Sequence, residues 1–159
     1  MPNWTENQIF ISHENPAQIE RVKDAKGELF QEFIPCPQEL LDGEGWYDWR
    51  VKHWGTKWDV NLGDICLPDS TTLYATFESA WSPPLEAYDK LVSMGFDITA
   101  YYYEYGIGFA GKYENGTRYH VNDDDFRNAN WRDGLPQDLT EFLESKYYAW
   151  QEIQDEMAE

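Results

Sequence analysis

The chain has 159 residues, of which 42% are hydrophobic and 17% are aromatic, so it can form a folded core and is not intrinsically disordered. Thirty acidic residues against twelve basic ones give a net charge of −18. This charge disfavours direct binding to nucleic-acid phosphates or anionic membranes and favours basic protein partners.

The sequence carries no signal that predicts export or membrane insertion. Its first residues are polar, and no apolar run approaches the roughly 20 residues of a membrane span. Cys36 and Cys66 form no CxxC pair, and His13, His53 and His120 are scattered along the chain. We therefore expect a cytoplasmic protein with two reduced thiols and without a metal or other cofactor.

The N-terminal third begins with the pattern of a strand followed by a helix. The apolar run at 8–12 predicts a buried strand. Asn15-Pro16 predicts the N-cap and first turn of a helix, which Gly27 is suited to end. Residues 28–56 contain prolines and glycines between apolar positions, which predicts a long, partly ordered inserted loop. A helical turn or two is expected within it, at 46–54.

The middle of the chain predicts two strands and then a second helix. Residues 57–60 start the first of these strands, and 71–79 alternate apolar and polar side chains as a half-buried strand does. Residues 81–84 end in a double proline that leads into a helix with an apolar stripe over 85–92. Gly95 is suited to end that helix.

Three β-prone segments follow, at 96–105, 107–113 and 117–121. The last two flank Asn115-Gly116, and Asn-Gly between β-prone runs is a specific signal for a tight hairpin. The glycines at 106–111 match neither phosphate-loop pattern and precede no helix. They therefore predict a β-bulge or a close approach of the backbone to another element.

This order of elements predicts an α+β fold. It fits a ferredoxin-like βαββαβ antiparallel sheet with an added β-hairpin and a C-terminal acidic helix. We expect a ferredoxin-like domain at 1–121 with the inserted loop 28–56, followed by an acidic loop and an amphipathic helix at 122–159 that packs on the domain or extends from it. Residues 122–159 contain eleven acidic and three basic residues, a net charge of −8.

Four ordered sequence blocks also carry a family resemblance. They are Met1-Pro2-Asn3-Trp4 followed by Asn7, His53-Trp54-Gly55-Thr56-Lys57-Trp58-Asp59, Thr76-Phe77-Glu78-Ser79-Ala80-Trp81-Ser82-Pro83-Pro84, and Tyr103-Glu104-Tyr105-Gly106-Ile107-Gly108-Phe109-Ala110-Gly111. Over roughly residues 1–120 the chain resembles the YubB-type ferredoxin-like domain family of phages and plasmids. The resemblance implies a mobile-element origin and supports the ferredoxin-like fold. It supplies no catalytic residue.

The acidic C-terminal region is the main candidate for partner binding. Carboxylates spaced by three and four residues along a helix form a dense negative strip. Such a strip either serves only solubility or imitates rows of phosphates and occupies the basic groove of a nucleic-acid-binding protein. The candidate partner-binding residues are Asp123, Asp124, Asp125, Asp138, Glu141, Glu144, Glu152 and Asp155. The first three lack the glycine and distal glutamate of a calcium loop.

Aromatic side chains offer an alternative site. Trp54, Trp58, Trp81 and Tyr105 could line a groove for a small ligand or a nucleotide. Packing at one end of the sheet explains such a cluster as well, and aromatic clusters more often form core.

The predicted function is therefore that of a non-enzymatic binding protein. We expect a phage or plasmid protein with anti-defence activity, which inhibits a CRISPR or restriction system of the host by DNA mimicry. Its partner would be the basic surface of a nucleic-acid-binding protein or complex. The alternative is a small-ligand or nucleotide-binding ferredoxin-like domain that uses the aromatic groove.

Overall fold

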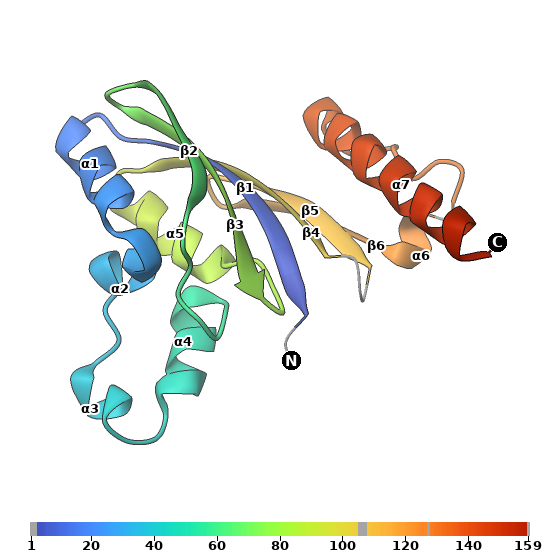
Figure 1. Cartoon of the computed structure of the whole chain (residues 1–159). Helices are drawn as coiled ribbons and strands as arrows, with labels where there is room; N and C mark the ends of the chain where they lie inside the picture. The colour runs from blue at the N-terminus through green and yellow to red at the C-terminus, as the bar shows by residue number, and fades with distance from the viewer. Residues whose placement is uncertain (1–2, 105–107, 127, 159) are drawn as a thin grey trace.

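The computed structural model describes residues 3–104, 108–126 and 128–158, and its centre is one antiparallel sheet (Figure 1). Six strands form it in the spatial order β2-β3-β1-β4-β5-β6. The strands are β1 (Trp4–Ser12), β2 (Gly63–Asp69), β3 (Thr72–Ala80), β4 (Asp97–Glu104), β5 (Phe109–Glu114) and β6 (Thr117–Asn122). Consecutive neighbours all pair antiparallel.

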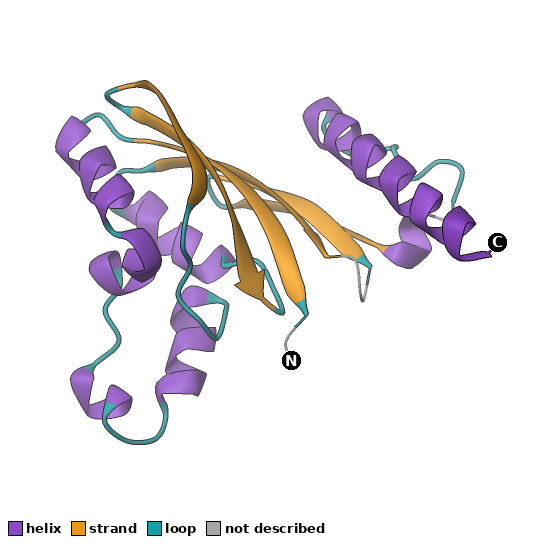
Figure 2. Ribbon diagram, in the orientation of Figure 1, coloured by secondary structure: helices purple, strands orange, loops and turns teal. Residues whose placement is uncertain are grey.

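Helices lie on both faces of this sheet (Figure 2). One face carries the layer of α1 (Pro16–Asp24), α2 (Leu29–Phe33), α3 (Gln38–Leu41), α4 (Trp46–Trp54) and α5 (Leu85–Ser93). Among the described residues, the helix on the other face is α7 (Gln137–Ala158), which the short helix α6 (Asp123–Phe126) precedes. The predicted α+β class is confirmed. Within the described ranges, no helix combines the length and the apolar character needed to cross a bilayer.

Local sequence signals explain several of these boundaries. The Asn15 side chain accepts a hydrogen bond from Ala17 N at 3.0 Å and so caps α1, as predicted. Asn115 and Gly116 both have positive φ, +45° and +101°, and join β5 to β6. Two positive φ values match the twist of the flanking strands, so the predicted Asn-Gly hairpin is confirmed.

The inserted segment at 28–56 is more ordered than predicted, because α2, α3 and α4 occupy much of it. The strand expected at 57–60 was wrong, since the next strand begins at Gly63. Asp59 explains the difference: its carboxylate accepts hydrogen bonds from Phe30 N (2.8 Å) and Gln31 N (2.9 Å) at the start of α2. The segment therefore satisfies a helix end instead of pairing with a strand.

The main core lies between the sheet and the larger helical layer. Ile9, Leu73 and Ile98 from three neighbouring strands are almost fully buried there against Tyr88 and Leu91 of α5. A second, smaller core lies beneath α7 on the opposite face. The two cores leave part of that opposite face uncovered, and this uncovered part holds the candidate site.

Candidate functional site

Helix α7 covers only one half of its sheet face. Leu139 and Leu143 are fully buried and belong to a cluster with Ala110 of β5 and Val121 of β6. The contacts of α7 with the sheet fall mainly on β4 and β5. The face of β1 and β3 beside the helix is therefore open, and side chains of alternate residues project from it.

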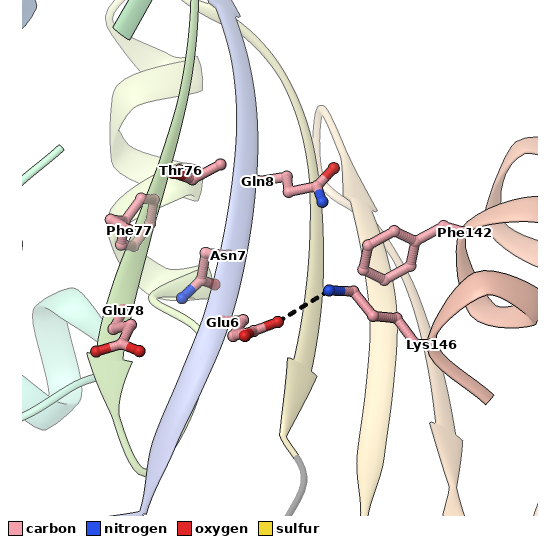
Figure 3. Close-up of a pocket in the computed structure, with 8 residues that line it drawn as sticks. All are labelled: Glu6, Asn7, Gln8, Thr76, Phe77, Glu78, Phe142 and Lys146. Atoms are coloured by element: carbon pink, nitrogen blue, oxygen red, sulfur yellow. Dashed lines mark hydrogen bonds and ion pairs between the residues drawn. The ribbon is translucent and has the colours of Figure 1, made fainter. Parts of the chain in front are cut away.

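A groove of about 300 Å³ lies between α7 and this open face (Figure 3). We call it the sheet groove and define it by Glu6, Gln8, Thr76, Glu78, Phe142 and Lys146. The first two come from β1, the next two from β3 and the last two from α7. Strands and a helix thus hold the polar groups on rigid elements.

Two carboxylates face each other across the strands of the sheet groove. Glu6 lies directly opposite Glu78 in the β1–β3 register. Directly opposed side chains of an antiparallel pair are about 4.5–5.5 Å apart at Cβ, and like charges at that separation destabilise a sheet. Glu78 is exposed and has no ion-pair partner among the residues that the structure describes. The two opposed carboxylates therefore favour the binding of a cation between or beside them.

One of the two carboxylates, that of Glu6, is paired with a lysine of the chain itself. Lys146 Nζ lies 3.0 Å from Glu6 Oε2 and 5.9 Å from the centroid of the Phe142 ring (Figure 3). A cation placed between a carboxylate and a ring face is stabilised by its electrostatic attraction to both. Lys146 therefore shows how a basic side chain sits in the sheet groove, while Glu78 is left for a second one.

An aromatic row continues the groove along the sheet. The Phe10 ring packs 4.7 Å from the Tyr74 ring and 6.4 Å from the Tyr101 ring, which in turn lies 5.2 Å from Phe142. Phe10 is 43% exposed. Exposed rings beside carboxylates suit a segment that carries both basic and apolar side chains.

Asp138 is exposed, but its carboxylate is already paired within the chain. Its carboxylate accepts hydrogen bonds from the Tyr101 hydroxyl and from Lys112 Nζ, the latter at 2.6 Å. Lys112 is almost fully buried, and a buried ammonium requires a charged partner. The residue predicted for partner binding thus anchors the start of α7 to the sheet.

Other acidic residues of this region also have partners within the chain. Glu144 pairs with Arg132 at 2.7 Å, and Glu141 accepts a hydrogen bond from Gln137. Asp125 accepts one from the Asn122 backbone, and Asp124 is exposed. The side chains of Asp123, Glu152 and Asp155 lie outside the described part of the structure. Across that part, no cluster of His, Cys, Asp and Glu is arranged to hold a metal ion.

Of the four aromatic residues predicted to share a ligand groove, the three that the structure describes do not line a common one. Trp54 is fully buried, and its Nε1 donates to the Ile34 carbonyl at 2.9 Å, so it is a core residue. Trp58 packs on Trp46 beside α4, with ring centroids 5.6 Å apart. Trp81 lines a separate groove at the ends of α4 and α5. Tyr105 lies outside the described residues.

Comparison with known protein families identifies a ferredoxin-like domain. The model of the ferredoxin-like domain in Api92-like protein matches residues 53–134, just over half of the chain. The chain belongs to this family. The predicted ferredoxin-like domain family is confirmed at this level. No characterised protein and no solved structure matched the sequence.

The match places the sheet groove at the border of the Api92-like ferredoxin-like domain. Thr76 and Glu78 lie within the matched residues, whereas Glu6 and Lys146 come from the segments before and after it. The sequence analysis missed Glu6, Glu78 and Lys146. Only the strand register and the position of α7 bring them together, and no local pattern encodes either.

Asp138→Asn should lower the free energy of unfolding by about 1 kcal/mol at pH 7, because it removes the negative partner of the Lys112 ammonium, an interaction that solvent partly screens. Burial alone would raise the pKa of Asp138, but the hydrogen bonds from Lys112 and Tyr101 outweigh it and lower this pKa. The stability that ionised Asp138 contributes is therefore complete above about pH 3.9, the pKa of an aspartate in the unfolded chain. It is lost as the pH falls through the lower pKa that Asp138 has in the folded state.

Urea unfolding followed between pH 7 and pH 2 measures this effect. The difference between the wild type and Asp138→Asn should shrink toward the acid end. Asp133→Asn, which alters an exposed carboxylate of the preceding loop, is the matched control and should leave the curve unchanged. A difference that persists at pH 2 would contradict the ionic role of Asp138.

Proposed function

We propose that the protein is a non-enzymatic binding protein that holds a basic segment of a partner protein in the sheet groove. The opposed pair Glu6 and Glu78 carries the proposal, because only Glu6 is neutralised by the described part of the chain. A partner lysine or arginine at Glu78 would complete the arrangement that Lys146 begins. The net charge of −18 would accelerate encounter with a basic surface.

We also propose the biological setting of this binding. A ferredoxin-like βαββαβ unit at residues 4–104, followed by the β5–β6 hairpin and the acidic α7, fits the YubB-type proteins of phages and plasmids. A basic partner surface that such an element would encounter is the nucleic-acid-binding groove of a host CRISPR or restriction complex. The protein would then act as an inhibitor that occupies this groove in place of DNA or RNA.

A peptide-binding measurement tests the site. An extended peptide with alternating arginine and leucine, labelled for fluorescence anisotropy, should bind at 50 mM salt and weaken strongly at 500 mM, since exposed charges are screened. Glu78→Gln should weaken binding about tenfold, equivalent to about 1.4 kcal/mol. Glu44→Gln removes the same charge from the loop before α4, away from the sheet groove, and should have little effect.

A DNA-cleavage assay tests the proposed inhibition of a host CRISPR or restriction complex. Purified restriction and CRISPR effector complexes are offered target DNA with and without the protein. Inhibition that excess DNA relieves, and that Glu78→Gln reduces, is the expected result. If no effector is inhibited while the peptide still binds through Glu78, the anti-defence role is wrong and the binding site stands. Equal peptide binding by Glu78→Gln and the wild type would reject the site.

A further inference from the structure

A second groove lies on the face of the sheet opposite to α7, beyond the N-terminal end of α5. Its volume is about 440 Å³, within the range of small-ligand sites. We call it the Trp81 groove and define it by Val51, Trp81, Glu86, Tyr102, Phe109 and His120. These residues come from α4, the β3–α5 connection, α5 and strands β4 to β6.

Trp81 adopts a backbone conformation that a bulky residue rarely adopts. Its φ is +71°, in the left-handed region, and the residue is 45% exposed. Hydrogen bonds fix the backbone around it: Trp81 N donates to Asn3 O at 2.8 Å, and Ser79 Oγ donates to Ser82 O at 2.7 Å. A strained conformation held this firmly is typical of ligand-binding positions. The exposed Trp81 residue lines the groove.

Three rings form the floor of the Trp81 groove. Tyr102 lies opposite Gly111 in the sheet, and Gly111 lies opposite His120, so the Tyr102 side chain crosses β5 to reach β6. Its hydroxyl is 2.9 Å from His120 Nδ1, and His120 Nε2 is 3.0 Å from Asn122 Oδ1. The Phe109 ring lies 5.6 Å from the His120 ring.

The hydrogen bonds of the floor are compatible with a neutral His120. An Nε2–H tautomer of His120 satisfies both contacts at once, because it donates to Asn122 and accepts from Tyr102. Burial raises the pKa of Tyr102 to about 12, so its hydroxyl stays protonated. Uncharged ring faces present a negative quadrupole, which attracts cations.

A carboxylate borders the same groove. Glu86 lies in the first turn of α5, packed so closely on Gly55 that a Cβ at Gly55 would lie 2.2 Å from Glu86 Oε2. Arg118 approaches Glu86 only to 3.8 Å, since it makes its close ion pair with Asp89 at 2.5 Å. Glu86 therefore keeps acceptor capacity toward the groove, whereas an incoming phosphate would meet this negative charge.

We propose that the Trp81 groove binds a planar cation, a guanidinium or an aromatic amidinium group, stacked on its rings and paired with Glu86. Such a group has two sources: a free small molecule, or an arginine side chain presented by another protein. The binding chemistry is the same for both. This site is separate from the sheet groove and does not depend on the function proposed for that groove.

Benzamidine and benzamide test the proposal, because they have the same shape and only benzamidine is charged. In nitrogen-15 NMR titrations of the full chain, benzamidine should give saturable shifts at the Trp81 indole and the Phe109 amide. Benzamide should bind about tenfold more weakly. Equal binding of the two, or shifts confined to the sheet groove, would overturn the proposal.

Variants of the full chain show which residues contribute to benzamidine binding. Glu86→Gln should weaken benzamidine binding about fivefold and Phe109→Leu about threefold. Trp58→Leu, which alters an exposed tryptophan outside the groove, should leave it unchanged. Glu78→Gln, which alters the sheet groove, should also leave benzamidine binding unchanged. The proposal for the Trp81 groove and the proposal for the sheet groove are therefore tested independently. Unaltered binding by both Glu86→Gln and Phe109→Leu would overturn the assignment.

A further arm distinguishes the two sources. N-acetyl-arginine methylamide carries the guanidinium of a protein side chain without an aromatic ring. Binding comparable to that of benzamidine supports an arginine side chain as the occupant, and binding of benzamidine alone supports a free aromatic cation. Binding of neither compound rejects the site.

Discussion

Trp54→Ala should lower the free energy of unfolding by about 4–5 kcal/mol, a large share of the total for a domain of this size. Trp54 is fully buried, and its ring packs 5.8 Å from Phe30 and 5.9 Å from Trp49. Truncation leaves a cavity where the helical insertion meets the main core. It also removes the donor to the Ile34 carbonyl, which then remains buried without its hydrogen bond.

Urea denaturation at constant pH measures this loss. Trp58→Ala is the matched control, because it deletes the same side chain four residues later in the chain. Trp58 is 42% exposed, and its removal should cost about 1 kcal/mol or less. Similar losses for the two variants would show that Trp54 is not the anchor of the insertion.

The contrast between these two tryptophans shows what the sequence could predict. Periodicity and turn chemistry predicted the helix capped by Asn15 and the hairpin at Asn115-Gly116, because both signals are local. Burial of Trp54 depends on how the insertion folds back on the core. Trp54 and Trp58 occur in the same short block of sequence, and nothing in that block distinguishes the buried ring from the exposed one.

The candidate site illustrates the same limit for charge. The sequence predicted an acidic strip on the C-terminal helix, yet the exposed carboxylate of Asp138 is paired with the buried Lys112. The opposed pair Glu6 and Glu78 is separated by about seventy residues and defined only by strand register. Composition gives the sign of the net charge, whereas the position of uncompensated charge required the fold.

Gly111→Ala should lower the free energy of unfolding by about 3 kcal/mol through overpacking. A Cβ at this position would lie 2.1 Å from the Tyr119 carbonyl oxygen and 2.3 Å from the Tyr102 hydroxyl oxygen. The sequence predicted a bulge or a close backbone approach for the glycines at 106–111. At Gly111 the close approach is to a neighbouring strand and to the tyrosine side chain that crosses it.

Two further variants separate the causes of this loss. Gly27→Ala, where a Cβ would meet nothing within 4 Å, should change stability by less than about 0.5 kcal/mol. Adding Tyr102→Phe to Gly111→Ala removes the hydroxyl but leaves the Tyr119 carbonyl in place, so only part of the stability should return. Full recovery would mean that β6 moves freely away from β5. No recovery would mean that Tyr102 already rotates aside, and the His120 contact in the Trp81 groove would then be lost in Gly111→Ala alone.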